Sequence, residues 1–309
     1  MNSYQLAIIG GGPAAVSAGV YAGRKKIKTI LITESFGGQS IVSEEIQNWI
    51  GTPSISGQQL AKDLEKHLRV YQGENLEIIT GDCVKNIQKS QEEFTIETTK
   101  EKTITAQTVL LATGSKRRKL KVPGADIFEH KGLTYCATCD APLFSGLDVA
   151  VIGGGNAALE TATQLSAHCQ KVYLLHRRNE FRADEITVEK IKANPKITIL
   201  TPVTPLEVLG DKMVTGLKYL NTETNQEKEL AVQGIFVEIG HLPNTPCVQD
   251  LVDLDEGKAI IVDPKNQRTS QAGIWAAGDC TDGLFKQNNI AVGDAIKALE
   301  DIYCYLHLR

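Results

Sequence analysis

Two stretches of the sequence decide the fold: Gln5-Leu-Ala-Ile-Ile-Gly-Gly-Gly-Pro-Ala-Ala15 and Asp148-Val-Ala-Val-Ile-Gly-Gly-Gly-Asn-Ala-Ala158. Each is a short apolar strand that runs into the pattern G-x-G-x-x-A, and apolar residues at helical spacing follow both. The glycine runs begin 143 residues apart (153 − 10), and each helix is followed by a second strand, at 29–33 and 171–175. The first glycine of such a loop allows the tight turn, the second lets the backbone approach a pyrophosphate, and the small sixth residue lets helix and strand pack closely. Two copies in this context predict two dinucleotide-binding units.

Composition agrees with a two-domain globular protein. The chain has 309 residues, of which 42% are hydrophobic and 23% charged, and its net charge is 33 − 37 = −4. This slightly acidic balance argues against nucleic acid or an anionic membrane as the main partner, because both recruit concentrated Lys and Arg. The first residues lack the basic start of a signal peptide, so we expect a cytoplasmic protein.

The residues after the second strands assign the two nucleotides. Glu34 follows the first of these strands, 24 residues beyond Gly10, where a carboxylate can accept the ribose hydroxyls of an adenosine without a 2′-phosphate. The matching place in the second unit holds His176, Arg177 and Arg178, whose donors suit a 2′-phosphate. We therefore expect FAD in the first unit and NADPH in the second. The alternative for the three basic residues is a solvated strand end.

The C-terminal part predicts that one domain is inserted in the other. Thr108–Gly114 is a buried strand ending in Thr-Gly, and Gly273–Asp279 repeats that form with a carboxylate at its end. Together with Lys286, Gln287 and a helix from about 290 to 306, the second strand can complete the first cofactor site. The expected fold is therefore α/β, with two Rossmann-like, three-layer dinucleotide-binding domains, the second inserted in the first. We place the FAD-binding domain at 1–116 and 246–309 and the NADPH-binding domain at 117–245. Two tandem domains are the alternative, but they leave the C-terminal segment without a sheet to join.

A cysteine pair points to redox chemistry. Cys136-Ala-Thr-Cys139 precedes the second glycine loop, and a C-x-x-C pair at a helix start can form a disulfide whose thiols have a lowered pKa. Asp140 is a candidate acid/base for the accompanying proton, or a helix N-cap, or both. Structural zinc would need a second pair of ligands, which the spacing does not offer, and a plain buried pair is the remaining alternative. The other cysteines are expected to be packing residues: Cys83, Cys169, Cys247, Cys280 and Cys304.

These motifs resemble the low-molecular-weight thioredoxin reductases over nearly the whole chain. The resemblance rests on the paired loops and on Gly37-Gly-Gln39, Cys136-Ala-Thr-Cys-Asp140, His176-Arg-Arg178, Phe181-Arg-Ala183, Ile239-Gly-His-Leu-Pro-Asn-Thr245 and Ala276-Ala-Gly-Asp279. Phe36-Gly-Gly-Gln39, Pro142-Leu-Phe144 and Phe236-Val-Glu-Ile-Gly240 are equally similar to the flavoprotein reductase component of alkyl hydroperoxide reductase. That component has an additional N-terminal redox domain, whereas the first loop here begins at residue 10, so we expect the stand-alone reductase.

The resemblance implies a thioredoxin-disulfide reductase, in which electrons pass from NADPH through FAD to Cys136–Cys139 and then to a protein disulfide. It implies that Cys139 lies against the flavin, that Cys136 attacks the disulfide of thioredoxin or a thioredoxin-like partner, and that Asp140 is the acid/base. It also implies a homodimer, whereas the expectation of no nucleic acid, membrane or metal comes from the charge balance and the cysteine spacing above. FAD would be held by Gly12, Pro13, Ala14, Glu34, Gly38, Gln39, Asn48, Val84, Thr113, Gly114, Asp279, Lys286 and Gln287. NADPH would be held by Gly155, Asn156, Ala157, Ala158, His176, Arg177, Arg178 and Arg182, with Glu160 near the nicotinamide.

The sequence also departs from the family pattern. Ala141 and Lys286 stand where Gly and Arg are usual, and Asn288 and Asn289 alter the helix start that would face the flavin. These changes bear on the flavin potential and on the partner. The alternatives are therefore a reductase of a glutaredoxin-like protein or a peroxiredoxin, a flavin dithiol oxidase of the same fold, and a nucleotide-binding protein without turnover. His176-Arg-Arg178 speaks against the oxidase, because an oxidase needs no nicotinamide.

Overall fold

The chain forms two α/β units. The computed structural model describes residues 3–43, 46–90, 93–135 and 137–307. Unit 1 comprises residues 1–116 and 242–309, and unit 2 comprises residues 117–241 and is inserted in unit 1. This arrangement confirms the predicted fold class. The second crossing between the units lies at His241–Leu242, a little before the expected position at 245.

Unit 1 is built on a seven-stranded sheet with the path β3-β2-β1-β6-β5-β4, to which β17 adds beside β6. The parallel strands are β1 (Ser3–Ile9), β2 (Thr29–Thr33), β3 (Leu76–Thr80), β6 (Thr103–Leu111) and β17 (Ile274–Ala276). The antiparallel strands β4 (Val84–Ser90) and β5 (Glu93–Thr98) continue the sheet beyond β6. Both faces of β1 are buried, as a central parallel strand requires.

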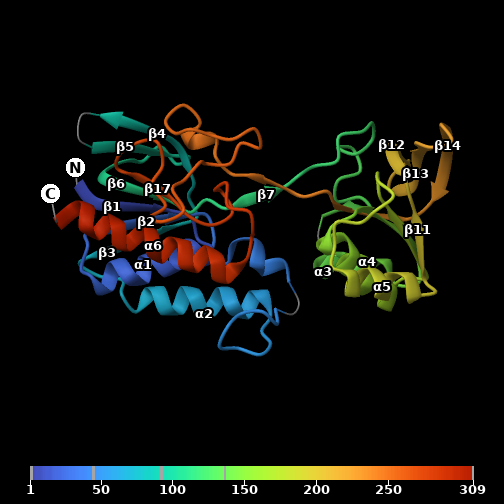
Figure 1. Ribbon diagram of the computed structural model, residues 1–309, viewed down its shortest axis with the longest axis horizontal. Coiled ribbons are helices and arrows are strands. Elements are labelled where there is room, and N and C mark those ends of the chain that lie inside the picture. The colour runs from blue at the N-terminus through green and yellow to red at the C-terminus, as the bar shows by residue number, and fades with distance from the viewer. Residues whose placement is uncertain (1–2, 44–45, 91–92, 136, 308–309) are drawn as a thin grey trace. The chain divides into compact units, whose positions relative to one another are not determined.

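Helices cover one face of this sheet. They are α1 (Pro13–Arg24) and α6 (Asn288–His307), with α2 (Gly57–Arg69) packed beside α1; Figure 1 shows α6 in red next to α1 in blue. Leu6 and Ile8 of β1 belong to the core under these helices, whereas Ala7 and Ile9 belong to the core on the opposite face. This alternation follows from the two-residue period of a strand. The short helix η1 (Gly38–Val42) lies in the connection between β2 and α2, and η3 (Pro246–Val248) follows shortly after residue 243.

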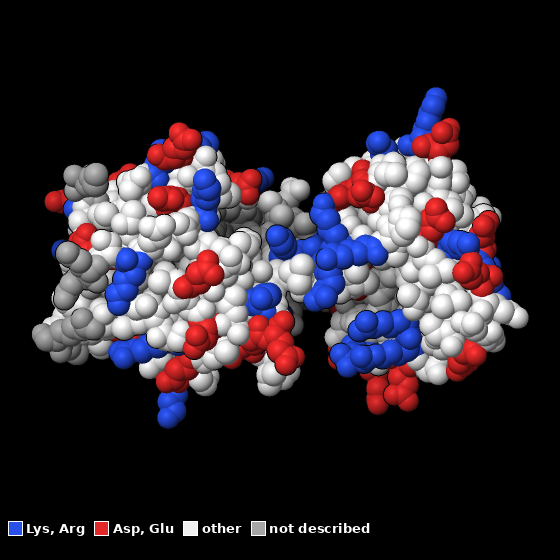
Figure 2. Space-filling view, turned by 90° about the horizontal axis from the view of Figure 1, so that it is seen from above, with Lys and Arg blue, Asp and Glu red and all other residues white. Residues whose placement is uncertain are grey.

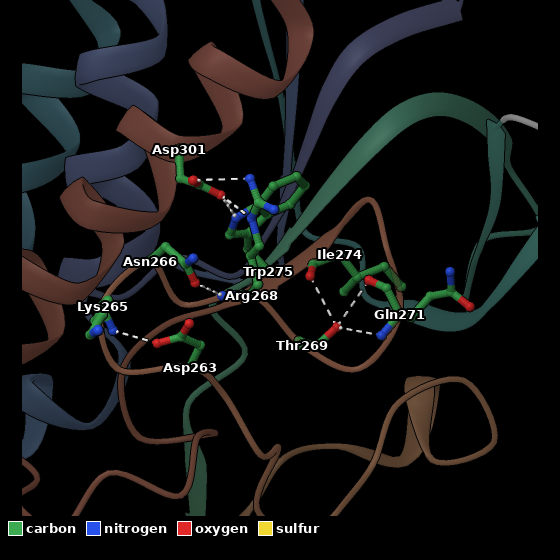
Figure 3. A network of polar contacts seen from close by, with 9 residues as sticks. All are labelled: Asp263, Lys265, Asn266, Arg268, Thr269, Gln271, Ile274, Trp275 and Asp301. Carbon is green, nitrogen blue, oxygen red and sulfur yellow. Dashed lines mark hydrogen bonds and ion pairs between the residues drawn. The ribbon is translucent and has the colours of Figure 1, made fainter. Parts of the chain in front are cut away.

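A polar network fastens α6 to β17 (Figure 3). The carboxylate of Asp301 accepts hydrogen bonds from Arg268 Nε at 2.5 Å and Nη2 at 3.1 Å, and from Trp275 Nε1 at 2.8 Å. Trp275 is fully buried, so its indole N–H depends on this one acceptor. Arg268 precedes β17 in the chain, and the network therefore ties the strand, the segment before it and the C-terminal helix together.

Unit 2 repeats the plan on a smaller scale. Its parallel sheet has the order β11-β10-β9-β15-β8, and a separate antiparallel sheet has the order β12-β13-β14. The strands are β8 (Leu133–Thr134), β9 (Asp148–Gly153), β10 (Lys171–Leu175), β11 (Ile197–Leu200), β12 (Val203–Gly210), β13 (Val214–Asn221), β14 (Gln226–Ala231) and β15 (Gly234–Glu238). The helices are α3 (Ala137–Asp140), η2 (Ala141–Phe144), α4 (Asn156–His168) and α5 (Glu185–Ala193). Val149 and Val151 of β9 pack with α4, while Ala150 and Ile152 face the core beside the antiparallel sheet.

The two segments that connect the units pair with each other. β7 (Ser115–Arg117) and β16 (His241–Pro243) form a two-stranded ladder. In the described ranges, no helix is both long and apolar enough to cross a membrane.

Candidate functional site

The first glycine loop has the geometry of a phosphate-binding turn. Gly10 has φ +134°, and a Cβ there would lie 2.1 Å from the carbonyl oxygen of Ala112, so that only glycine fits. Gly12 is the N-cap of α1, with an extended backbone and no side-chain capping bond. No side chain at the N-cap therefore occupies the amides in the first turn of α1, and these amides can bind an anion.

A cavity of about 340 Å³ lies in front of this loop, within the size range of ligand sites. The predicted FAD residues that line it are Gly12, Pro13, Ala14, Glu34, Gly38, Gln39, Val84, Thr113, Gly114 and Asp279. The wall also contains Asn288, at the helix start expected to face the flavin, and four residues that the sequence analysis did not assign to the flavin site: Ser40, Asp82, Cys83 and Asn244. The hydroxyl of Thr113 is buried in this wall beside the Cys280 thiol.

Three other predicted FAD residues are bonded elsewhere and are not in the cavity wall. Asn48 Nδ2 donates to Gln287 Oε1 at 3.0 Å, and Lys286 Nζ donates to the carbonyl oxygen of Thr281 at 2.6 Å. Asn289 Nδ2 donates to the carbonyl oxygen of Asn48 at 2.6 Å. The loop that carries Asn48 is thus tied to the start of α6, beside the cavity.

Glu34 and Cys83 meet at the end of β2. The Cys83 thiol lies 3.6 Å from Glu34 Oε2 and donates to it. Burial and the neighbouring charge of Glu34 raise the pKa of the Cys83 thiol, so the thiol form is favoured. Glu34 is exposed and keeps acceptor capacity for ribose hydroxyls. The open helix start and the exposed acid together fit an adenine dinucleotide such as FAD.

The second loop repeats the turn with a different lining. Gly153 has φ +159°, and a Cβ there would lie 2.3 Å from the carbonyl oxygen of Glu238. Gly155 is the N-cap of α4, again extended and without a side-chain cap. The Arg182 amide donates to the carbonyl oxygen of Gly154 at 2.7 Å, which brings the segment after β10 against the loop.

His176 lies against this loop. A Cβ on Gly154 would lie 2.2 Å from His176 Nδ1, and the imidazole stacks on Phe181 at 5.5 Å between ring centroids. Its Nε2 lies 3.1 Å from the carbonyl oxygen of Glu180. Burial lowers the pKa of His176, and the charges of Arg177, Arg178 and Arg182 lower it further. A neutral imidazole that donates from Nε2 fits these contacts.

The basic residues around His176 remain open. Arg177, Arg178 and Arg182 are exposed, and among the described residues none of the three forms an ion pair. In Figure 2 the larger gatherings of Lys and Arg lie on unit 2. Asn156 Oδ1 accepts from the Asp184 amide at 2.8 Å, which joins the start of α4 to the start of α5. These donors fit a nucleotide that carries an extra phosphate.

The redox pair is described only in part. Cys136 lies outside the described residues, and Cys139 belongs to α3 but its side chain is likewise outside the description. The carboxylate of Asp140 accepts a hydrogen bond from the hydroxyl of Thr134 on β8. Partial burial and the charge of Asp184 raise the pKa of Glu160 on α4.

The other five cysteines do not behave alike. Cys169, Cys247 and Cys280 are buried, and burial raises the pKa of Cys169 and of Cys247 to about 11. Cys83 lines the cavity and Cys304 is exposed on α6. The expectation of a packing role is therefore wrong for Cys304 and incomplete for Cys83.

Comparison with known proteins agrees with this geometry. The profile of the family described as "Pyridine nucleotide-disulphide oxidoreductase" matches residues 4–295. The chain belongs to this family. Membership implies that the chain binds a flavin and a pyridine nucleotide, as the two loops suggest.

Two relatives are similar in sequence to nearly the whole chain. The chain is 37% identical to "NADH dehydrogenase" of Bacillus subtilis (strain 168) over 98% of its own length and 58% of the relative's. It is 38% identical to a component of alkyl hydroperoxide reductase from Pseudomonas putida over 96% of its length and 57% of the relative's. It thus spans less than three fifths of either relative.

Its fold is similar to thioredoxin reductase of Lactococcus lactis in the FR conformation, with a TM-score of 0.93, 33% identity and coverage of 99% and 100% of the two chains. Thioredoxin reductase of T. acidophilum gives a TM-score of 0.90 and 35% identity, with 99% of each chain covered. These family members confirm the fold and the predicted resemblance.

Proposed function

We propose that this member of the family is an NADPH-dependent, FAD-containing disulfide reductase whose acceptor is thioredoxin or a thioredoxin-like protein. The observation that carries the proposal is that unit 2 contains both a C-x-x-C motif at α3 and an open glycine loop with basic residues near it. A disulfide pair and a nicotinamide site in one unit serve a single electron path. The full-length similarity to two thioredoxin reductases supports thioredoxin as the acceptor.

In this proposal unit 1 holds the flavin nucleotide. The amides at the start of α1 bind the pyrophosphate, Glu34 accepts the ribose hydroxyls, and Thr113 and Asp279 complete the wall. Bound FAD supplies the two-electron relay between the nicotinamide and the cysteine pair. The Cys83 thiol orients Glu34 through their hydrogen bond.

Unit 2 holds NADPH and the cysteines. Gly155, Asn156, Ala157 and Ala158 cradle the pyrophosphate at the start of α4, and Arg177, Arg178 and Arg182 bind the 2′-phosphate. His176 acts as a neutral positioning residue between the loop and Phe181. Glu160 lies near the nicotinamide in this arrangement.

The cysteines perform thiol–disulfide exchange. The Cys136 thiolate attacks one sulfur of the partner disulfide and displaces the other as a thiolate, which Asp140 helps to protonate. The Cys139 thiolate then attacks the mixed disulfide, so that the partner leaves as a dithiol and Cys136–Cys139 is oxidised. Two electrons that leave NADPH as a hydride restore the Cys136–Cys139 dithiol. A homodimer and a cytoplasmic location form part of the proposal.

A peroxiredoxin is the second candidate acceptor. It is favoured by the similarity to the alkyl hydroperoxide reductase component of Pseudomonas putida, which at 38% identity covers 96% of the chain. The two candidates share every step as far as the cysteine pair and differ only in the disulfide that Cys136 attacks.

The test is an anaerobic titration of the FAD-loaded chain with NADPH and with NADH, followed by turnover assays with thioredoxin, a glutaredoxin-like protein and a peroxiredoxin. NADPH should bleach the flavin at far lower concentration than NADH. Cys139→Ser should retain flavin reduction and lose turnover of thioredoxin disulfide, whereas Cys304→Ser on α6 should match the parent. Normal thioredoxin turnover by Cys139→Ser would refute the cysteine assignment, and equal use of NADH would refute the phosphate clamp.

A further inference from the structure

An ion pair in unit 2 has no role in the function proposed above. Arg117 Nη1 lies 2.8 Å from Glu238 Oε1, and the Glu238 side chain is only 7% exposed. Thr161 Oγ1 on α4 donates to the same oxygen at 3.2 Å. Burying a carboxylate to this extent is costly even when it is paired, so its position calls for an explanation beyond stability.

Glu238 stands where a bound nucleotide would end. It is the last residue of β15, opposite Gly153 in the register of the parallel sheet. The central strand β9 has β10 on one side and β15 on the other. In open α/β sheets the ligand lies outside the carboxyl ends of the strands, at the point where the strand order reverses. With the 2′-phosphate donors after β10, the nicotinamide end of the nucleotide extends toward β15.

The pair offers a donor and an acceptor side by side. Both bonds to Glu238 go to Oε1, and the described residues supply no hydrogen bond to Oε2. Likewise, Arg117 Nε and Nη2 have no hydrogen-bond partner among the described residues. A primary carboxamide has the complementary groups, an N–H donor and a carbonyl acceptor, and nicotinamide carries one.

Resting on the proposed function, we propose that Arg117 and Glu238 recognise the nicotinamide carboxamide, with Glu238 Oε2 accepting from its N–H and Arg117 donating to its carbonyl oxygen. Burial raises the pKa of Glu238 and Arg117 opposes that rise. The alternative is that the pair only anchors β7 to the sheet of unit 2. The two roles differ in their dependence on the ligand's amide group.

Equilibrium binding to the oxidised full chain separates the roles. The probes are NADP⁺, its 3-acetylpyridine analogue, in which a methyl group replaces the amide nitrogen, and 2′-phospho-ADP-ribose, which lacks the pyridine altogether. One charge-assisted hydrogen bond predicts that the chain binds NADP⁺ about tenfold more tightly than the acetylpyridine analogue. Isothermal titration calorimetry measures all three without turnover.

Two variants then test each residue. Glu238→Met should bind NADP⁺ and the acetylpyridine analogue with about equal affinity, because the acceptor of the amide N–H is lost. Arg117→Met should weaken NADP⁺ and its analogue alike and keep their ratio, because both carry the carbonyl. Neither variant should change the Kd of 2′-phospho-ADP-ribose. The matched control is Glu227→Met, which breaks the exposed Lys218–Glu227 pair of unit 2 and should reproduce the parent.

The outcomes are distinguishable. A ratio near one in the unmodified chain overturns the inference without reference to any variant. An unchanged ratio in Glu238→Met overturns it as well, and equal weakening of all three ligands by either variant assigns the pair to the fold. If none of the three ligands binds the unmodified chain, the proposed function itself fails.

Discussion

The two glycine loops share one backbone turn and differ in what surrounds it. The first turn lies beside a cavity of about 340 Å³. Its wall includes the connection between β3 and β4, the residues after β17 and the start of α6, together with the acid Glu34. Around the second, Arg177, Arg178 and Arg182 stand exposed to solvent. In the proposed function the turn places a pyrophosphate in both units, and the surrounding segments select the nucleotide.

The difference suits two kinds of ligand. In the proposed function the cavity of unit 1, which is lined by segments far apart in sequence, holds the resident cofactor. An exposed set of arginines suits a nucleotide that arrives and leaves in each cycle, because opposite charge speeds association. The predictions below test the dependence of unit 1 on distant segments and the neutral imidazole of unit 2.

The largest effect is expected at the turn itself. Gly10→Ala forces a residue at φ +134° to place a Cβ 2.1 Å from the carbonyl oxygen of Ala112, and we expect a loss of about 3 kcal/mol in the free energy of unfolding. Denaturant unfolding of the apoprotein measures it. Gly12→Ala is the control, because its Cβ would be 3.9 Å from the nearest atom, Gly38 Cα.

Gly12→Ala should leave the apoprotein stable and still lower its flavin content, because the added methyl group occupies the side from which the pyrophosphate approaches. The ratio of flavin to protein after reconstitution measures this second effect. Equal stability of the Gly10→Ala and Gly12→Ala apoproteins would contradict the steric argument, and full flavin content in Gly12→Ala would contradict the assignment of the loop.

These glycines show what the sequence could predict. The turns, the strands before them and the helices after them are local features with characteristic periods, so the fold class followed from them, whereas the insertion of the second unit was inferred from the strand-like segment Gly273–Asp279. Asp82 and Cys83 could not be assigned that way. They reach the cavity because β3 pairs with β2, and the Asp82 amide donates to the carbonyl oxygen of Thr33 at 3.3 Å.

The resemblance to a family names site residues but does not predict which local contacts these residues make in this chain. It implies that Asn48, Lys286 and Gln287 hold the flavin, which stays a prediction; in the structure Asn48 Nδ2 donates to Gln287 Oε1 and Lys286 Nζ donates to the carbonyl oxygen of Thr281. It also counts His176 among the residues that hold NADPH, and this stays a prediction; the structure shows the imidazole packed on Gly154 and Phe181. Such contacts depend on neighbours brought together by the whole fold, and no spacing in the sequence encodes them. The signal for Arg117 and Glu238 is equally nonlocal, since 121 residues separate them.

A smaller effect is expected from the network that fastens α6. Asp301→Ala leaves the buried indole N–H of Trp275 without its acceptor, and we expect a loss of about 2 kcal/mol in unit 1. Because α6 packs on α1, amide hydrogen exchange should accelerate in both helices and remain unchanged in α4 of unit 2.

Glu300→Ala on the same helix is the matched control. It removes the Lys25–Glu300 pair, in which Glu300 is 51% exposed, and should cost less than about 0.5 kcal/mol. Equal acceleration of exchange in α4 and α6 of Asp301→Ala would show that the network does not act on unit 1 alone.

The smallest effect is a pH dependence of stability centred on His176. Burial and three arginines lower the pKa of His176 in the folded chain, so the unfolded chain binds more protons between that value and the ordinary pKa of about 6.5. The stabilisation from the neutral ring is therefore present above pH 6.5 and is lost as the pH falls through the folded-state pKa. Denaturant midpoints should fall less between pH 7.5 and pH 5.5 in His176→Gln than in the parent chain. If His176→Gln keeps the full pH dependence, then the imidazole is not held neutral against Gly154, and the proposed contrast between a positioning histidine and the exposed arginines around it is lost.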